Sequence, residues 1–390
     1  MGDAQEQVLI VGAGPVGLVA ATALAEQGIP SKVFEISRGL PQDLRASTFH
    51  PPTLDMLDRF GITDRLIERG LVCPQWQFRD RKEGIVATFD LGLLAADTAH
   101  PYRLQCEQWK LAELLRARVE ASSLTDIVYE AEAVGVTQDD DGVTLRIVRP
   151  DGSEEHFRGR YLVAADGARS AIRKSVGIEL EGLTIPEIFL SMSTHFAFDE
   201  AIADLAPIAY LTDPEEWRVL LPTDPNLSEA EITDKAVMEK RLQRLCLNAA
   251  GYDIAHSTAY RVHERIANRY VAGRVFLAGD AAHLNNPLGG MGMNGGIHDA
   301  VNLSEKLTEV WHGAPLDSMA RYERQRRKVA LETVQAQTLR NRKMMAERSP
   351  EARRAYHDEL RRTVADPKAH RDYLLRSSMI QSLRDLEAVA

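Results

Sequence analysis

The chain has 390 residues, a length typical of two closely joined domains and ample for a large buried core. Hydrophobic residues make up 44% of it and charged residues 27%, which is the composition of a globular protein rather than a disordered one. The net charge of -10 argues against a general nucleic-acid binder, because such a protein needs a basic face for phosphates.

The cysteines and the first residues indicate a compartment. The 3 cysteines are widely spaced and form neither a Cys-x-x-Cys pair nor a Cys/His metal pattern, so we expect free thiols and no metal site. The N-terminus lacks the basic start and small-residue cleavage site of a signal peptide. No apolar run is long enough to cross a bilayer. We therefore expect a cytoplasmic protein without membrane attachment.

The first elements form a β-α-β unit. Residues 8–11 are a short apolar run with β-branched side chains, which is typical of a buried parallel strand. Residues 18–27 predict an alanine-rich helix that ends at Gly28, and 32–35 predict the next strand.

Helices and strands alternate in the next part of the chain. Apolar spacing predicts helices at 52–60 and 105–121. Residues 126–149 predict two strands joined by a turn at 139–142, and 161–165 predict a buried strand that runs directly into Asp166.

The character of the sequence changes at about residue 184. A helix predicted at 231–249 interrupts this region, and a buried strand returns at 275–278 before a mostly helical end. Segments that alternate as antiparallel strands do are 188–198, 208–211 and 217–221.

The first chemical motif lies between the first strand and the first helix. In Gly12-Ala-Gly14-Pro-Val-Gly17, the first glycine permits a tight turn, the second lets the backbone approach a pyrophosphate, and the third permits helix packing. Glu35 follows at the distance where a carboxylate accepts hydrogen bonds from ribose hydroxyls. This pattern predicts dinucleotide binding, but it does not distinguish FAD from NAD.

Two later segments make that distinction. Residues 162–173 contain Asp166-Gly167, and 273–283 contain Gly279-Asp280 and run on into a glycine-rich stretch at 287–294. In these ordered motifs the chain resembles the class A flavoprotein monooxygenases, the para-hydroxybenzoate hydroxylase family, from about residue 6 to about residue 330. Pro51-Pro-Thr53 resembles the same stretch in single-component para-nitrophenol monooxygenases and hydroxypyridine hydroxylases.

The resemblance implies noncovalently bound FAD. Asp280 would accept from ribityl hydroxyls, and the glycines near 290 would hold the flavin edge with backbone N–H groups. Asp166 would order the pyrophosphate loop, Arg45 would face the phosphates, and Gln105 would contact the flavin from the start of a helix. The predicted FAD-binding residues are Gly12, Gly14, Pro15, Val16, Gly17, Glu35, Arg45, Gln105, Asp166, Asp280, Gly290, Gly292, Met293 and Asn294.

Candidate substrate residues are less firmly marked. Tyr210 or His195 would polarise a ring hydroxyl, and Arg218 would pair with an acidic substituent. No family motif fixes these three, and each also has a purely structural interpretation. The resemblance places Pro287 at the border of the cavity beside the flavin.

The implied fold is α/β, with a Rossmann-like FAD-binding domain interrupted by a sheet-rich substrate domain and followed by C-terminal helices. The FAD-binding parts are 1–183 and 266–345, and within the first part 71–100 contribute to the substrate domain. Residues 184–265 form the substrate sheet domain. We expect 346–390 to be helical, and either to pack across the FAD-binding domain or to form a homodimer contact.

The implied reaction belongs to aromatic compound degradation. A single-component oxidoreductase would hydroxylate a phenolic or hydroxypyridine-type substrate with NADH or NADPH and O2, through a flavin C4a-hydroperoxide. Two alternatives stay open: a related FAD-dependent reductase that does not hydroxylate, and a flavin-binding scaffold without activity. The sequence does not decide the substrate, the choice of NADH or NADPH, or the oligomeric state.

Overall fold

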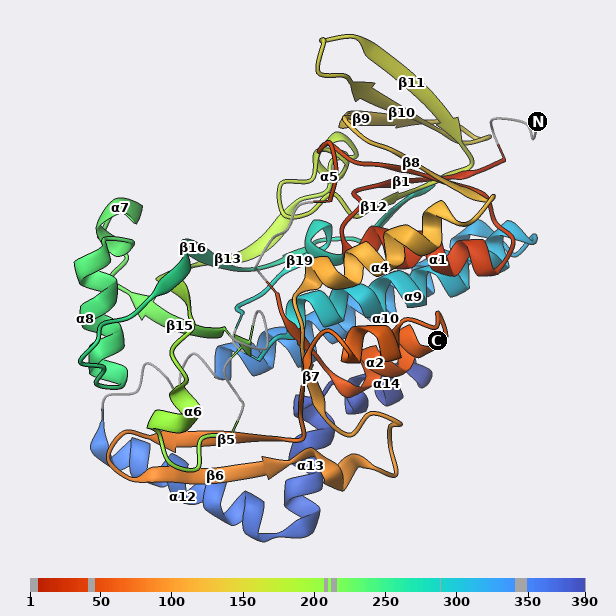
Figure 1. The fold of residues 1–390 in the computed structure, drawn as a ribbon. Coiled ribbons are helices and arrows are strands. Elements are labelled where there is room, and N and C mark those ends of the chain that lie inside the picture. Colours follow the sequence, from red (N-terminus) through yellow and green to blue (C-terminus); the bar gives the residue numbers. More distant parts are fainter. Residues whose placement is uncertain are drawn as a thin grey trace.

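The structure is a computed structural model. It describes residues 6–40, 46–206, 210–211, 216–287, 289–340 and 349–389, without the side chains of 186, 187, 210 and 211. A central sheet and a second sheet lie side by side, with a group of C-terminal helices below them (Figure 1). The α/β fold predicted from the sequence is confirmed.

The central sheet has six strands and is parallel except at one edge. Its strands β1, β12 and β18 are buried on both faces, which explains why they read as continuous apolar runs. β1 pairs with β2 on one side and with β12 on the other, so the strand order reverses direction there. The strands in spatial order are β17 (Val271–Ala272), β18 (Val275–Leu277), β12 (Tyr161–Ala164), β1 (Val8–Val11), β2 (Ser31–Phe34) and β8 (Thr125–Val128).

The two faces of the central sheet are covered differently. Helices α1 (Pro15–Glu26), α4 (Gln108–Glu120) and α9 (Met291–Trp311) pack below it in Figure 1. A small antiparallel sheet covers the other face, with strands β9 (Glu132–Gln138), β10 (Val143–Val148) and β11 (Glu154–Gly159). The sequence predicted two strands over 126–149, and the structure has three, because β8 joins the central sheet.

Two of the helix predictions need correction. Helix α1 begins at Pro15 rather than at residue 18, since proline at the first helical position is already shaped for a helix. Gln105 does not begin a helix but ends strand β7 (Arg103–Gln105). Its neighbour Cys106 donates its backbone N–H to the Ser47 carbonyl at 2.7 Å, which keeps this segment extended. β7 pairs with β3 (Thr48–Phe49) and β4 (Leu71–Cys73).

The second sheet is antiparallel. β13 (Leu180–Thr194) starts several residues before the predicted strand and pairs with β16 (Ile254–Ala267) along its length. The other strands are β14 (Tyr210–Leu211), β15 (Trp217–Thr223) and β19 (His283–Leu284). The predicted helix at 231–249 is two helices, α7 (Glu229–Ile232) and α8 (Lys235–Leu245), because Asp234 caps the second.

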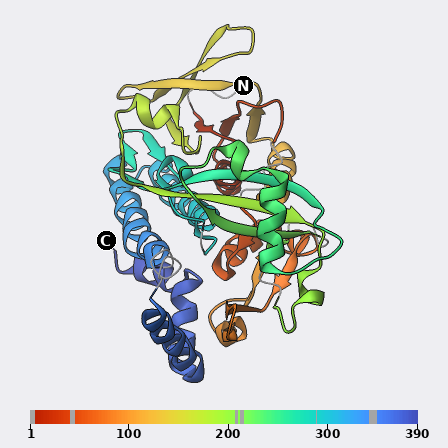
Figure 2. The ribbon, with the colours of Figure 1, turned by 90° about the vertical axis from the view of Figure 1, so that its left-hand side faces the viewer.

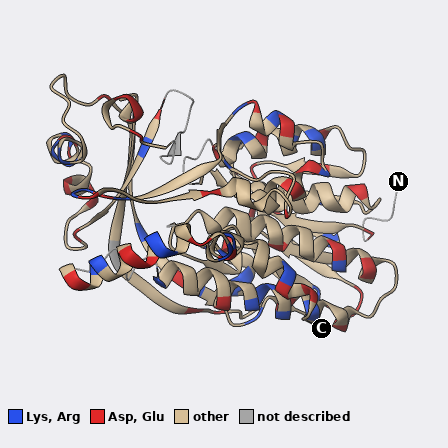
Figure 3. Cartoon of the chain, turned by 90° about the horizontal axis from the view of Figure 1, so that it is seen from below, with Lys and Arg blue, Asp and Glu red and all other residues tan. Residues whose placement is uncertain are grey.

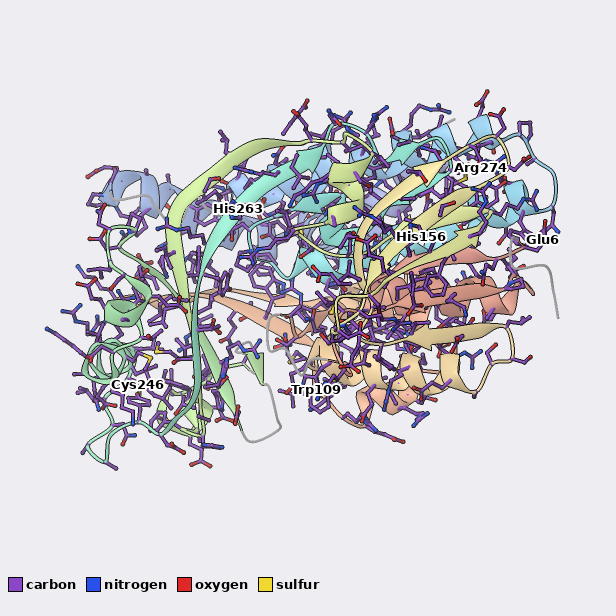
Figure 4. The ribbon with its side chains drawn as sticks, turned by 90° about the horizontal axis from the view of Figure 1, so that it is seen from above. Glu6, Trp109, His156, Cys246, His263 and Arg274 are labelled. Atoms are coloured by element: carbon purple, nitrogen blue, oxygen red, sulfur yellow. The ribbon has the colours of Figure 1, made fainter. Side chains whose placement is uncertain are left out.

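Helix α8 covers one face of the second sheet. Leu190 and Met192 of β13 and Val219 of β15 form an apolar cluster with Leu242 of this helix. Figure 4, in which Cys246 marks the end of α8 and Trp109 the start of α4, shows the second sheet between these two points. The opposite face of the second sheet is therefore turned towards the central sheet and its helices.

The C-terminal helices pack on a hairpin from the first third of the chain. The hairpin strands are β5 (Gln75–Asp80) and β6 (Gly84–Asp90), and the helices are α12 (Pro350–Ala365), α13 (Pro367–Ser377) and α14 (Ile380–Glu387). Asp97 pairs with Arg371 and Arg384, each at 2.6 Å, and so ties these helices to the segment after the hairpin. Figures 1 and 2 show them at the opposite end from β9–β11.

The remaining elements are short. They include α2 (Pro51–Asp58), α3 (Thr63–Ile67), α5 (Ala171–Ser175), α6 (Phe198–Ala201), α10 (Ala320–Lys328) and a π-helix at Val329–Gln335. Charged residues of both signs are interspersed along the outer faces of the molecule (Figure 3). Within the described ranges, no helix is long and apolar enough to cross a bilayer.

Candidate functional site

The three predicted motifs meet at the carboxyl ends of β1, β12 and β18. A Cβ atom added at Gly12 would lie 2.4 Å from the Ala165 carbonyl oxygen, and one at Gly279 would lie 2.9 Å from the Val16 side chain. These close approaches join segments that are far apart in the chain. The three motifs therefore lie at the point where the strand order reverses, and open α/β sheets bind their ligands at such points.

The glycine loop is shaped for a phosphate group. Gly12 has a φ of +101°, and a Cβ atom at Gly17 would lie 2.0 Å from the Gly12 carbonyl oxygen, so both positions need glycine. At Gly14, by contrast, no described atom beyond its chain neighbours lies within 4 Å of the added Cβ position. This open side lies at the N-terminus of α1, where backbone N–H groups attract a pyrophosphate. The loop therefore fits the dinucleotide part of FAD.

The Glu35 carboxylate is fixed against this loop. Its Oε2 accepts a hydrogen bond from the Ala13 N–H at 2.9 Å, and its Oε1 accepts from the Ser37 N–H at 3.0 Å. Each carboxylate oxygen can accept more than one hydrogen bond. The contact with a ribose stays a prediction, and the structure shows that Glu35 also shapes the loop itself.

A buried arginine joins the other two motifs. Arg173 donates from Nη1 to the Ala281 carbonyl and from Nη2 to the Ala168 carbonyl, each at 3.0 Å. Asp166 accepts from the Ile172 N–H at 3.2 Å, and burial raises the pKa of its carboxyl above the usual range. Asp280 stands in the turn Gly279–Ala281 with an exposed side chain. Arg173 has no role predicted from the sequence, since only the fold brings the two loops together.

The glycine loop before α9 lies against β3. Gly289 and Gly290 have φ values of +105° and +66°, and a Cβ atom at Gly290 would lie 2.9 Å from Cβ of Thr48. A Cβ atom at Gly292 would lie 3.1 Å from the Asn285 side-chain oxygen. These positions let the N-terminus of α9 approach a ligand with its N–H groups. Met293 in the first turn is partly buried against the core.

The side chain of Asn294 forms hydrogen bonds that link this loop to β3 and His50. Its amide nitrogen donates to the Thr48 carbonyl at 2.7 Å and to the Gly290 carbonyl at 2.6 Å. Its amide oxygen accepts from the His50 N–H at 2.9 Å. The side chain is thus engaged within the protein, and a contact of Asn294 with the cofactor stays a prediction. Gln105 is also engaged, because its Oε1 accepts from the Thr48 hydroxyl at 2.8 Å.

The sequence interpretation missed His50, which is fully buried beside the same loop. Its Nε2 donates to the Gly289 carbonyl at 2.8 Å. Burial first, and then the charge of Arg103, lower the pKa of His50 to about 3, although the Gly289 contact acts in the opposite direction. The imidazole is therefore neutral at physiological pH. A single histidine before two prolines carries no sequence signal for this role.

A buried network of Asp299, His283 and Arg326 lies next to the Gly279–Ala281 turn and the first turns of α9. Asp299 of α9 accepts from the Gly279 N–H at 3.0 Å and pairs with Nε2 of His283 at 2.7 Å. Its other oxygen pairs with Nε of Arg326 at 2.5 Å, and Arg326 donates to the Gly295 carbonyl. This network fixes the turn that carries Asp280 and the first turns of α9.

In the second sheet, Arg218 of β15 reaches the segment before β3. Its side chain is buried, and its Nη1 lies 3.5 Å from the Ser47 hydroxyl, which precedes β3. Pro287 is partly buried, and its carbonyl accepts from the Gly290 N–H at 3.0 Å. Tyr210 pairs with Arg218 in the strand register, but its side chain lies outside the described residues, as does all of Arg45.

His195 is placed differently from the other candidates. β13 ends at Thr194, so His195 follows the strand instead of lying on it as predicted. Its ring is 48% exposed and pairs with Asp253 at 2.9 Å and with Glu216 at 3.5 Å. The structure therefore places Arg218 against the segment before β3 and Pro287 in the loop before α9, and it holds His195 in an exposed acidic cluster.

Comparisons with known proteins agree with this geometry. A family model described as an FAD binding domain matches residues 5–337. The para-nitrophenol 4-monooxygenase of Pseudomonas sp. (strain WBC-3) is 33% identical over 97% of each chain. The 6-hydroxy-3-succinoylpyridine 3-monooxygenase of Pseudomonas putida (strain DSM 28022 / S16) is 30% identical over 85% of this chain and 86% of its own.

A solved structure is similar over nearly the whole chain. The crystal structure of p-nitrophenol 4-monooxygenase from Pseudomonas putida DLL-E4 superposes with a TM-score of 0.91 at 32% identity. The match covers 97% of this chain and 98% of that one. The agreement therefore includes the second sheet and the C-terminal helices as well as the dinucleotide-binding part.

Proposed function

Because the chain belongs to the family of FAD-dependent aromatic monooxygenases, we propose that it is a single-component enzyme that hydroxylates a phenolic or hydroxypyridine-type substrate. NADH or NADPH is the proposed reductant, and O2 the proposed oxidant. The observation that carries this proposal is the position of Arg218. Its buried guanidinium lies on the face of the second sheet away from α8 and contacts Ser47. The next residue, Thr48, accepts a hydrogen bond from Asn294 in the first turns of α9.

FAD, once reduced, supplies the activation of O2 that ring hydroxylation requires. In the proposed site the open side of Gly14 and the start of α1 hold the pyrophosphate, and Asp280 holds the ribityl chain. The N–H groups at the start of α9 would bind the electron-rich edge of the flavin. The buried face around Arg218 orients the substrate and excludes water from the reacting atoms.

The names of the relatives guide the choice of substrate class. Para-nitrophenol and 6-hydroxy-3-succinoylpyridine are each a hydroxylated ring with an electron-withdrawing group or a ring nitrogen. An electron-donating hydroxyl activates a ring towards electrophilic oxygen. We therefore propose a ring hydroxyl as the common feature, with the other substituents set by the second sheet.

The test is oxidation of NADH and NADPH by the purified flavoprotein in the presence of a panel of phenols and hydroxypyridines. We expect members of the panel to stimulate the oxidation several-fold, with consumption of O2 and formation of a hydroxylated product. Failure of every compound to stimulate oxidation would contradict the proposal. So would stimulation that yields only H2O2 with all of them.

We expect Arg218→Met to uncouple the reaction while FAD stays bound. A charge-assisted hydrogen bond contributes about 1.5–3 kcal/mol, so acidic substrates should bind roughly tenfold to a hundredfold more weakly. Oxygen activation continues without a correctly held ring, and flux then goes to H2O2. The measurement is the ratio of product to NAD(P)H consumed. Arg241→Met on α8, at the outer face of the sheet, is the matched control and should leave this ratio unchanged.

A further inference from the structure

Ser193 carries a buried hydroxyl for which the described residues offer no hydrogen-bond partner. The residue is 1% exposed, and its Oγ has no hydrogen-bond partner among the residues that the structure describes. Such a group is costly to bury, because it loses its hydrogen bonds to water without replacement. An unpartnered buried hydroxyl in a native protein therefore points to a missing partner.

The strand register shows which way this hydroxyl faces. Leu190 and Met192 of β13 pack in the apolar cluster under α8, and successive side chains of a strand point to opposite faces. Ser193 therefore belongs to the other face, and it stands directly opposite Arg218 in the register of β13 and β15. Since Arg218 reaches Ser47, this face is turned towards the FAD-binding side.

The two side chains together define the chemistry of what they bind. A guanidinium has only hydrogen-bond donors, and a serine hydroxyl can donate. We propose that Ser193 is a substrate-binding residue whose hydroxyl, beside Arg218, donates to an oxygen-acceptor substituent of the aromatic substrate. The substrate class is then a hydroxylated ring that also carries a nitro or carboxylate group. This inference rests on the proposed function, because it requires an aromatic ligand at this face.

The test measures ligand binding to the oxidised holoenzyme, without turnover, through the change in flavin absorbance. The probes are 4-nitrophenol and 4-hydroxybenzoate, with 4-methylphenol as the matched ring that lacks the acceptor. Ser193→Ala should weaken binding of the better acceptor ligand about three- to tenfold and leave 4-methylphenol unchanged, as expected for one hydrogen bond. Equal effects on all the ligands, or no effect on any, would overturn the proposal.

A second measurement separates a binding role from a structural one. In the absence of ligand, Ser193→Ala should keep or raise the melting temperature, because it removes an unsatisfied buried group. Ser304→Ala is the matched control: its hydroxyl on α9 is also buried and without a described partner. It should show the same change in melting temperature and no change in ligand affinity. A lower melting temperature for Ser193→Ala alone would mean that a structural partner, such as a buried water, uses this hydroxyl.

The outcomes distinguish this proposal from the one on which it rests. If no phenol stimulates NAD(P)H oxidation by the wild-type enzyme, the proposed function itself fails. If phenols do stimulate oxidation but the wild type binds neither acceptor ligand more tightly than 4-methylphenol, only the role of Ser193 is contradicted. The same holds if Ser193→Ala binds all three ligands as the wild type does.

Discussion

Asp299→Ala should lower the free energy of unfolding by about 3–5 kcal/mol, because it leaves a buried cation without its counter-charge. The side chains of Asp299 and Arg326 are 0% and 1% exposed, and the two are in direct contact. The substitution also removes the acceptor for the Gly279 N–H and for His283. Urea unfolding of the holoenzyme measures the change, and we expect FAD to be lost with it.

The pH dependence of unfolding gives a further check on this network. Burial alone would raise the pKa of Asp299, but the charges of Arg326 and His283 outweigh it and hold the pKa at about 2. Since the folded-state pKa of Asp299 lies below its unfolded value, the ionised carboxylate stabilises the fold fully at pH values above the unfolded pKa of about 4. It is lost as the pH falls towards 2. Asp299→Asn should therefore show a shallower loss of stability over this range.

A double variant is the control for this explanation. Arg326→Met alone should also destabilise the protein, because Asp299 is then the unpaired charge. The double variant Asp299→Leu/Arg326→Met should be less destabilised than the sum of the two single changes. Strict additivity would show that the ion pair is not the source of the effect.

Gly14→Val should abolish FAD binding while the protein stays folded. The backbone at Gly14 is extended, with φ of -72° and ψ of 178°, so valine fits the conformation without strain. Its side chain would occupy the open side of the loop, where we expect the pyrophosphate. Loss of this contact should reduce FAD affinity by at least about a hundredfold, equivalent to roughly 3 kcal/mol. Flavin absorbance per protein and far-ultraviolet circular dichroism measure cofactor content and fold separately.

Gly17→Ala is the contrasting variant in the same loop. Its new methyl group would lie 2.0 Å from the Gly12 carbonyl oxygen, which is backbone and cannot move aside cheaply. We expect this variant to unfold at a lower temperature even when excess FAD is present. Normal FAD content in Gly14→Val would show that the pyrophosphate lies elsewhere.

Local rules account for the parts of the site that the sequence predicted. The turn at Gly12 and the strand ends at Asp166 and Asp280 follow from short apolar runs that stop at small or acidic residues. Apolar spacing downstream of Gln105 predicts a helix there, but pairing of Gln105 with the distant Thr48 in a sheet overrides that preference. An alternating pattern of apolar residues predicts that a strand exists but not where it ends, so it does not show that β13 stops before His195.

Contacts between distant segments could not be predicted in this way. Ser47 and Arg218 are separated by 171 positions, and Thr48 and Asn294 by 246. Nothing in the composition of either segment marks its partner. The burial of the Ser193 hydroxyl depends in the same way on packing that only the folded chain defines.

The contact between the hairpin β5–β6 and the C-terminal helices has a consequence for biosynthesis. A two-stranded hairpin is at best marginally stable alone in water. Its aromatic face, where Trp76 stacks on Phe89 at 4.1 Å, also meets Tyr373 of α13. Asp97, just after the hairpin, and Arg371 of α13 are 274 positions apart. During synthesis on the ribosome, the aromatic face of the hairpin therefore stays uncovered until the C-terminal helices have been made. We expect the nascent protein to be prone to aggregation during that interval, until its last helices cover this surface.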